Sequence, residues 1–315
     1  MSHTVTIICP VFNEAAVIES FYRELRRVLD LLATRYEADM LFVVDRCSDA
    51  TPDILQQIAT RDRSVKILFL SSRFGHQASL LAGMDHVRAD ITIMMDCDLQ
   101  HPPSLIPELL AEFEKGYDVV YTIRKDPPGT SFLKRATSRL FYRLINRISD
   151  VPINESAADF RLVSRRVVAV FQKEIRERNQ FLRGLFSWVG FRSTGVAYTA
   201  GERQGGTSKY SLTRMIRFAM HGLVSFSKGP LQAAVVLGFL FATFGLLFAA
   251  VTFVQYFLYT SLPSGWTTLA ILISVFSGVQ LIFLGLIGEY IGAIFDEVKA
   301  RPHYLVEQQV NFDDD

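Results

Sequence analysis

Two carboxylates stand two positions apart behind an apolar run, in the segment MMDCDLQHPP that covers residues 94–103. If the run is a strand, Asp96 and Asp98 lie at its carboxyl end, where a divalent ion could join them to a diphosphate. Carboxylate and carbonyl oxygens suit Mg²⁺ or Mn²⁺, and these ions commonly keep substrate phosphates among their ligands. A pair of acidic turn residues is the alternative, because Asp also favours turns and helix starts.

Two other polar clusters follow apolar runs in the same way. The segment CPVFNE covers residues 9–14, and the segment VDRCSDAT covers residues 44–51. In an open parallel sheet the carboxyl ends of the strands share one edge, and ligands bind there. Unrelated turns rarely converge in this manner, so the sequence favours one site assembled from all three clusters.

Short apolar or β-branched runs alternate with amphipathic stretches from Val5 to Ile123. This alternation predicts an α/β fold with a mainly parallel sheet and helices on both faces. The periodicity predicts strands at Val5–Cys9, Met40–Val44, Val65–Leu70, Ile91–Met95 and Val119–Ile123, and helices at Ala15–Leu32, Pro52–Ala59, Gln77–Val87 and Pro103–Lys115.

The 315 residues include 33 Lys and Arg against 32 Asp and Glu, a net charge of +1. Such a balance gives the protein no overall positive electrostatic potential that would attract nucleic acid. We therefore expect no nucleic-acid partner, and any binding driven by charge must be local. Cys9, Cys47 and Cys97 lack CxxC spacing, which argues against a disulfide framework or a zinc site and fits a reducing compartment. Because no basic start precedes a signal-peptide core, we expect the first domain to stay in the cytosol.

Two segments near the C-terminus have the composition of membrane spans. Leu231–Tyr259 and Thr267–Gly288 contain no charged residue, and each exceeds the ~20 residues needed to cross hydrocarbon. We therefore predict transmembrane helices at about 231–259 and 267–293. Lys and Arg flank the pair but are missing from the connector 260–266, so both soluble ends should lie in the cytosol, as in a multi-pass protein of the cytoplasmic membrane.

An amphipathic pattern precedes the first span. Apolar residues recur at helical spacing over 212–229, with Arg214 and Arg217 on the other side. This pattern predicts a helix in the membrane interface, and the alternative is a helix docked on the soluble domain. Composition divides the chain into four predicted parts: a cytosolic domain at 1–211, the interfacial helix at 212–229, the two spans within 230–295, and a cytosolic tail at 296–315 that we expect to be solvated or frayed.

Five motifs, in this order, resemble those of family 2 glycosyltransferases of the polyprenyl-phosphate type. They are PVFNE, VDRCSDAT and DCDLQHPP, followed by DFRL at 159–162 and GGTSKY at 205–210. GEYIG at 288–292 and DEVK at 296–299 further resemble the two-span bacterial undecaprenyl-phosphate glucosyltransferases, which are related to dolichol-phosphate mannose synthase. The resemblance covers nearly the whole chain. It implies a GT-A-like nucleotide-sugar-binding domain, Mg²⁺ or Mn²⁺ as cofactor, and a nucleotide-diphosphate sugar and a polyprenyl phosphate lipid as substrates.

The resemblance also implies a role for individual positions. It implies Asp96, Asp98 and Gln100 as metal ligands, and Asp159 and Arg161 as residues of the reacting centre. The implied donor-binding residues are Pro10, Val11, Glu14, Asp45, Asp96, Arg203, Ser208 and Lys209. Arg124 and Arg135 are implied to hold the acceptor phosphate.

The chain departs from the family pattern at two places. Relatives usually carry Asp-Asp-Gly-Ser or Asn-Asp-Gly-Ser after the second strand, whereas this chain has VDRC at 44–47. This difference leaves open which nucleotide base the donor carries. His101 stands where an acidic residue is common, and we interpret it as a capping or solvent-facing residue.

The expected reaction is an inverting transfer that gives a β-linked polyprenyl-phosphate sugar. Family analogy favours UDP-glucose and undecaprenyl phosphate, with GDP-mannose, UDP-N-acetylhexosamine and UDP-aminoarabinose as alternative donors. A processive synthase is disfavoured because Gly184 replaces the Trp of the Gln-x-x-Arg-Trp signature, and a nicotinamide enzyme because GxGxxG is missing after the first strand. A membrane-anchored non-enzymatic scaffold remains an alternative, and the paired spans are compatible with a homo-oligomer.

Overall fold

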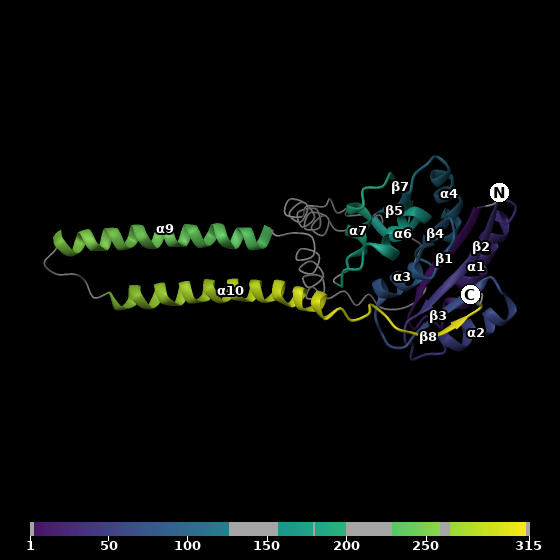
Figure 1. The fold of residues 1–315 in the computed structure, drawn as a ribbon, viewed down its shortest axis with the longest axis horizontal. Coiled ribbons are helices and arrows are strands. Elements are labelled where there is room, and N and C mark those ends of the chain that lie inside the picture. The colour runs from purple at the N-terminus through teal and green to yellow at the C-terminus, as the bar shows by residue number, and fades with distance from the viewer. Residues whose placement is uncertain (1–2, 126–156, 179, 200–228, 259–264, 313–315) are drawn as a thin grey trace.

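The computed structural model describes residues 3–125, 157–178, 180–199, 229–258 and 265–312. These residues form an α/β domain and two long helices that project from it side by side (Figure 1). The expected interfacial helix at 212–229 lies outside the described residues except for Gly229, where the first long helix begins.

An eight-stranded sheet forms the centre of the α/β domain, in the order β7-β5-β6-β4-β1-β2-β3-β8. Strand β1 pairs in parallel with β2 and β4, β2 with β3, and β5 with β7, whereas β6 and β8 are antiparallel to their neighbours. The predicted mainly parallel α/β fold is therefore confirmed. The strands are His3–Val11 (β1), Tyr36–Val44 (β2), Val65–Leu70 (β3), Ile91–Met94 (β4), Val119–Lys125 (β5), Ala157–Ser164 (β6), Ser193–Thr199 (β7) and Val306–Val310 (β8).

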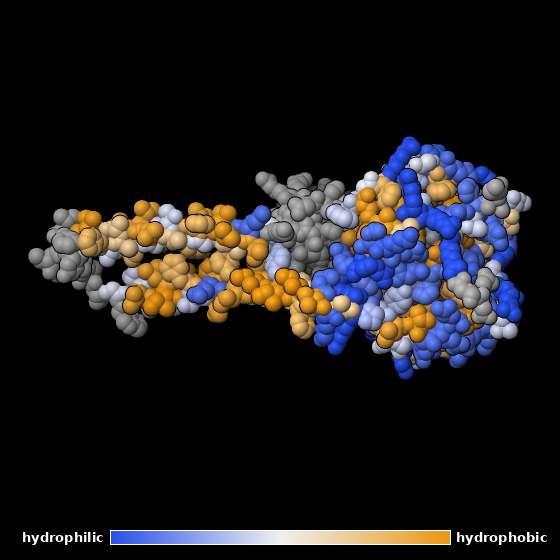
Figure 2. Space-filling view, in the orientation of Figure 1, coloured by the Kyte–Doolittle hydropathy of each residue, from blue (hydrophilic) through white to orange (hydrophobic). Residues whose placement is uncertain are grey.

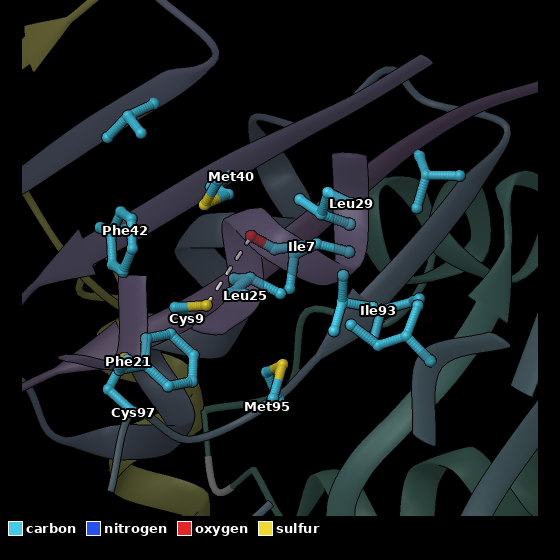
Figure 3. Close-up of a cluster of buried hydrophobic side chains, with 14 of the residues drawn as sticks. Ile7, Cys9, Phe21, Leu25, Leu29, Met40, Phe42, Ile93, Met95 and Cys97 are labelled. Atoms are coloured by element: carbon cyan, nitrogen blue, oxygen red, sulfur yellow. Dashed lines mark hydrogen bonds between the residues drawn. The ribbon is translucent and has the colours of Figure 1, made fainter. Parts of the chain in front are cut away.

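Helices cover both faces of the sheet. Helices α1, α2 and α4 contribute to one buried cluster, and α3, α6 and α7 contribute to the other. Successive side chains of a strand point to opposite faces, so Ile7 and Cys9 enter the first cluster, which Figure 3 shows, and Ile8 enters the second. The helices are Ile18–Leu32 (α1), Thr51–Arg61 (α2), His76–Asp85 (α3), Ile106–Glu114 (α4), Arg165–Lys173 (α6) and Leu182–Trp188 (α7), with a 3₁₀ turn at Pro103–Leu105 before α4.

The C-terminal tail corrects the expectation of a solvated or frayed end. Its residues Val306–Val310 form β8, which pairs with β3 at the edge of the sheet. Beyond the strand, the Asn311 side chain donates hydrogen bonds to the carbonyl oxygens of Ala59 and Val65, both at 2.8 Å. The sequence VEQQV contains no apolar run, so local periodicity could not predict this strand. It forms because it pairs with β3, which lies far away in the sequence.

Helices α9 (Gly229–Leu258) and α10 (Trp266–Lys299) form the projecting pair. Their segments Gly229–Gln255 and Ile271–Lys299 are long and apolar enough to cross a membrane, and no residue in the most apolar stretch of either segment is buried inside the protein. Figure 2 shows the resulting apolar surface beside the polar α/β domain. The Phe241 and Phe276 rings meet edge to face between the two helices, with centroids 5.8 Å apart. The two predicted spans fall on these helices.

Candidate functional site

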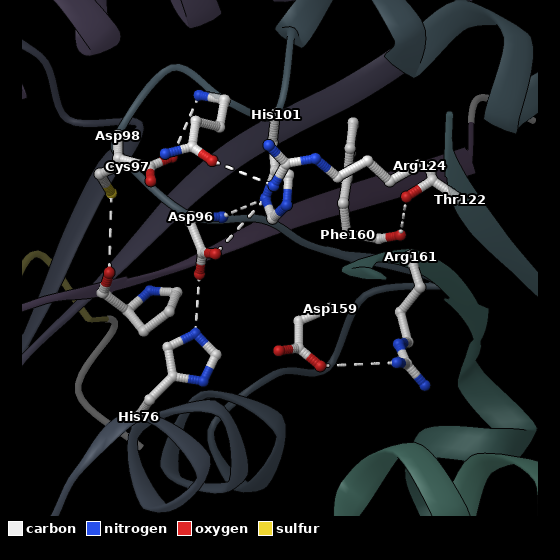
Figure 4. Close-up of polar contacts among 12 residues, drawn as sticks. His76, Asp96, Cys97, Asp98, His101, Thr122, Arg124, Asp159, Phe160 and Arg161 are labelled. Atoms are coloured by element: carbon white, nitrogen blue, oxygen red, sulfur yellow. Dashed lines mark hydrogen bonds and ion pairs between the residues drawn. The ribbon is translucent and has the colours of Figure 1, made fainter. Parts of the chain in front are cut away.

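The paired carboxylates lie at the carboxyl end of β4, as the sequence predicted (Figure 4). Hydrogen bonding to β1 continues through Met95, whose N–H donates to the carbonyl oxygen of Ile8 at 3.1 Å, and the chain then leaves the sheet. The Asp98 carboxylate accepts a hydrogen bond from the backbone N–H of Gln100 at 3.0 Å, and Leu99 between them has a φ of 60°. This tight turn holds Asp96 and Asp98 at the edge of the sheet.

Two histidines contact Asp96. The Nε2 atom of His76, the first residue of α3, lies 2.7 Å from the Asp96 Oδ1 atom. The Nδ1 atom of His101 accepts the Asp96 backbone N–H at 3.0 Å, which requires that nitrogen to be unprotonated. Burial alone would raise the pKa of Asp96, but the hydrogen bond and charge of His76 act against burial, and that pKa lies below its usual value. Asp96 is thus available as an anionic ligand.

The interpretation of His101 as solvent-facing is wrong. Only 7% of the residue is exposed, and its ring stacks on Phe160 of β6 with centroids 5.3 Å apart. The ring also meets Tyr198 of β7 edge to face. His101 instead accepts the backbone N–H of Asp96 through Nδ1, just after the end of β4. Aromatic neighbours from two later strands were invisible to local sequence reasoning.

The residues at this edge fit a divalent ion that keeps phosphate ligands. Among the described residues, no group of three or more His, Cys, Asp or Glu side chains is arranged to enclose a metal. Mg²⁺ is typically bound through one or two carboxylates together with substrate phosphates, which is what Asp96 and Asp98 could offer. The Gln100 Oε1 atom accepts a hydrogen bond from Arg124 at 3.2 Å, so its proposed role as a metal ligand stays a prediction.

Asp159 of β6 stands between two arginines. The Arg183 guanidinium from α7 makes a bidentate contact with this carboxylate: Nε donates to Oδ1 at 2.8 Å, and Nη2 donates to Oδ2 at 2.7 Å. The Arg161 Nη2 atom lies 3.6 Å from Asp159 Oδ1 (Figure 4). The Arg183 contact was missed, although Arg183 belongs to the Gln-Phe-Leu-Arg segment that we compared with the signature of processive synthases.

The charges of this trio are strongly coupled. Burial would raise the pKa of Asp159, but the hydrogen bond and charge of Arg183, helped by Arg161, hold the pKa far below its usual range. Burial lowers the pKa of Arg161 to about 10, and the attraction of Asp159 offsets only part of that effect. Arg161 is 4% exposed, and its guanidinium lies over the Phe186 ring. All three groups are therefore ionised near neutral pH.

The first two polar clusters meet at the same edge, as predicted. The Asn13 side chain donates to Ser48 Oγ at 3.1 Å and accepts the Ser48 N–H at 2.8 Å. The Glu14 N–H donates to Thr51 Oγ1 at 2.9 Å. Pro10 and Val11 are the last two residues of β1. The turn after β1 and the turn after β2 thus form one connected surface.

Asp45 has a structural task that the sequence did not reveal. It is 3% exposed, and its two carboxylate oxygens accept the backbone N–H groups of Phe74 at 2.8 Å and Gly75 at 2.9 Å. Asp45 therefore holds the loop between β3 and α3, and contact with a nucleotide stays a prediction. The same loop carries Arg73, whose guanidinium lies 4.0 Å above the Phe12 ring. Loop 71–76 lines this edge of the sheet and was missed because it contains no acidic pair or glycine-rich motif.

Four site residues implied by the resemblance lie outside the described residues. They are Arg135, Arg203, Ser208 and Lys209. Arg124, the other residue implied for the acceptor phosphate, is exposed near the end of β5 and contacts Gln100.

The glycosyl transferase family 2 model matches residues 6–171, which include the three polar turns and Asp159. The uncharacterized glycosyltransferase YkcC of Bacillus subtilis (strain 168) is 40% identical over 96% of this chain and 93% of its own length. The SfII prophage-derived bactoprenol glucosyl transferase of Shigella flexneri is 37% identical over 96% of this chain and 97% of its own length.

Among solved structures, glucosyl-3-phosphoglycerate synthase from Mycobacterium tuberculosis in complex with Mg²⁺ and UDP is similar, with a TM-score of 0.48 and 16% identity. The similarity covers 72% of this chain and 81% of that chain. The family match over more than half of the chain, together with full-length relatives at 37–40% identity, assigns the family: the chain belongs to glycosyl transferase family 2.

Proposed function

We propose that this glycosyltransferase moves glucose from UDP-glucose to undecaprenyl phosphate, with inversion, at the cytosolic face of a membrane. The relative from Shigella flexneri is a bactoprenol glucosyl transferase by name, which supports a bactoprenol acceptor and a glucosyl group. The observation that carries the proposal is the Arg124–Gln100 contact, which joins an exposed arginine to the turn whose Gln100 N–H donates to the Asp98 carboxylate. Arg124, the proposed ligand of the acceptor phosphate, would thus lie next to the residues expected to hold the donor diphosphate.

The acceptor's chemistry limits what the protein must do. A phosphate monoester has a second pKa of about 6, so its attacking oxygen is already mostly ionised near neutral pH. The residues need to orient that oxygen rather than remove a proton from it. An arginine suits this task because its planar guanidinium donates two parallel hydrogen bonds to a phosphate. Arg124 is proposed for this contact, and Arg135 is proposed as its second member.

The donor side is assigned to the acidic edge and the adjoining turns. A divalent ion bound there would neutralise charge on the departing nucleoside diphosphate. Asp96 and Asp98 would hold that ion, with Gln100 as a further ligand. Pro10, Val11, Glu14 and Asp45 are proposed for the nucleotide, and Arg203, Ser208 and Lys209 for the diphosphate. Arg161, together with Asp159, is proposed for the reacting centre.

Membrane placement follows from the same proposal. Helices α9 and α10 would cross the bilayer and return, with the α/β domain and both chain ends in the cytosol. Strand β8 supports this topology, because it follows α10 and pairs with β3 of the α/β domain. Soluble parts that share one sheet must lie on one side of the membrane.

Product identification tests the proposal. The purified full-length protein is incubated with Mn²⁺, undecaprenyl phosphate and separate nucleotide sugars, namely UDP-glucose, GDP-mannose, UDP-N-acetylhexosamine and UDP-aminoarabinose. We expect a glucosylated lipid by mass and a β-anomeric signal by NMR. Exclusive transfer of another sugar would replace the donor assignment, an α-linked product would refute inversion, and no lipid product with any donor would refute the function.

A further inference from the structure

A pocket lies away from the acidic edge, where the end of α10 meets the α/β domain. Its volume is about 420 Å³, within the ~300–1,000 Å³ typical of small-molecule sites. Described residues from two segments line it: Arg176 and Arg178, which follow α6, and Ala300, Pro302, His303 and Tyr304, which follow α10. None of these residues was assigned a role in glycosyl transfer.

Hydrogen bonds fasten the two walls of this pocket to each other. The Arg178 N–H donates to the Glu297 carboxylate in the last turn of α10. The His303 ring donates through Nε2 to the carbonyl oxygen of Arg176 at 3.2 Å. Between these contacts the chain turns sharply, because Ala300 has a φ of 48° and ends the helix. The pocket is therefore a built feature of the junction.

Two arginines and a histidine are among the residues that line the pocket, and Asp85 of α3 holds part of the lining in place. Arg176 pairs with Asp85 of α3 at 2.7 Å, and the Tyr304 hydroxyl donates to the same carboxylate at 2.8 Å. The Arg178 guanidinium enters none of the ion pairs found among the described residues. Burial and then the charges of Arg178 and Arg176 lower the pKa of His303, against smaller opposing effects of the Arg176 carbonyl hydrogen bond and Asp85. An anion is the ligand that such a lining favours.

The position of the pocket indicates the source of that anion. It begins directly after the apolar segment Ile271–Lys299, at the end of α10 that joins the α/β domain. Figure 2 shows the apolar surface of α10 giving way to polar surface at this junction. Basic pockets at the cytosolic ends of membrane helices lie at headgroup depth, where anionic lipids are available.

We propose that this pocket binds the phosphate group of an anionic phospholipid headgroup, and so anchors the junction between α10 and the α/β domain. Arg178 supplies the main charge, and His303 and Arg176 complete the lining. The inference rests on the proposed membrane spans. It does not depend on which sugar is transferred, or on whether transfer occurs.

The test is lipid retention measured by native mass spectrometry, without donor or polyprenyl phosphate. The full-length protein is extracted from vesicles of phosphatidylcholine mixed with phosphatidylglycerol, and the bound lipids are counted. We expect retention of phosphatidylglycerol over phosphatidylcholine. Losing one charge-assisted contact should reduce that preference about tenfold in Arg178→Gln, and His303→Gln should reduce it in the same direction.

Matched variants separate the pocket from general charge effects. Arg178→Lys keeps the positive charge and should retain most of the preference. Arg35→Gln removes an exposed arginine that pairs with Glu114 on the α/β domain, away from the pocket, and should leave the preference unchanged. Wild-type preference in both Arg178→Gln and His303→Gln would overturn the proposal. Displacement of the lipid by inorganic phosphate as readily as by short-chain phosphatidylglycerol would overturn the lipid assignment. An inactive protein that retains the lipid would separate failure of the proposed transferase function from failure of this inference.

Discussion

The Arg183 guanidinium holds both carboxylate oxygens of Asp159, at 2.8 and 2.7 Å. A carboxylate in this two-pronged contact is a weak proton acceptor, because its pKa is held far below the usual range by Arg183 and Arg161 against the effect of burial. In the proposed mechanism the pair therefore orients charge at the reacting centre. Asp159 would act on the substrates through its two arginines.

This arrangement predicts that Asp159→Asn lowers turnover without removing the rising limb of the pH profile. Without the carboxylate the two arginines should be misplaced, which should lower turnover about 10²-fold. The rising limb of the pH profile, near pH ~6, should persist because it reports ionisation of the acceptor phosphate. The low pKa means that the Asp159 carboxylate is ionised throughout the assay. Its contribution to stability is present above the unfolded pKa of about 4 and is lost only as pH falls through the folded value.

The measurement is the pH dependence of transfer for the wild type and Asp159→Asn. Arg183→Lys should share the turnover defect, because an ammonium group cannot reproduce the two-pronged contact. Disappearance of the rising limb in the Asn variant alone would instead identify Asp159 as a general base.

Replacing either edge carboxylate should abolish transfer. Asp96→Asn and Asp98→Asn each remove a negative ligand for the expected divalent ion, so donor binding should lose its dependence on Mn²⁺. The check is calorimetric titration of UDP with and without Mn²⁺, alongside turnover. Asp90→Asn, which changes a half-buried carboxylate that contacts Thr4 at the start of β1, serves as the control. Full turnover in both edge variants would refute the metal assignment.

Arg124→Ala should impair transfer while donor affinity stays nearly unchanged, because Arg124 is proposed to hold the acceptor phosphate. Loss of a charge-assisted phosphate contact should cost about 1.5–3 kcal/mol in kcat/KM for the lipid. Arg192→Ala removes an arginine that lies over Tyr117 and should have little effect. An equal loss of UDP affinity in Arg124→Ala would move this residue to the donor side.

Gly83→Ala should destabilise the α/β domain without changing the site directly. A Cβ atom at Gly83 of α3 would lie 2.4 Å from Cγ2 of Ile8 in β1, so the helix or the strand must shift. Such overpacking typically costs about 1–3 kcal/mol, measurable as a lower unfolding temperature. Gly245→Ala in α9 meets nothing within 4 Å and is the matched control. Equal stability of wild type and Gly83→Ala would contradict the close contact between helix and strand.

Asn311→Gly should loosen the C-terminal strand. Glycine tolerates the φ of 60° at this position, so the substitution removes the two side-chain hydrogen bonds to Ala59 and Val65 while keeping the backbone conformation. We expect faster hydrogen exchange at the amides of β8 and β3. Gln308→Ala, at an exposed position of β8, should leave exchange unchanged. Unaltered protection in Asn311→Gly would show that strand pairing alone holds the tail.

The sequence by itself determined the first five strands, the helices between them and the two long apolar helices. These elements follow from local periodicity: an apolar strand buried between two helical layers, such as Ile91–Met94, must be apolar on both faces. Local pattern also located Asp96 and Asp98, because they stand directly after such a strand. Family membership likewise rested on motifs that are each continuous in the sequence.

Only the tertiary structure decided which distant residues complete the site. Strand β6 runs antiparallel between β4 and β5, and this insertion sets Asp159 in the sheet while α7 brings Arg183 to it. His76 meets Asp96, and β8 meets β3, in the same long-range way. Local periodicity records whether a side chain is buried, not which distant segment lies against it. Those contacts depend on the strand order and on where each helix ends, which only the folded chain specifies.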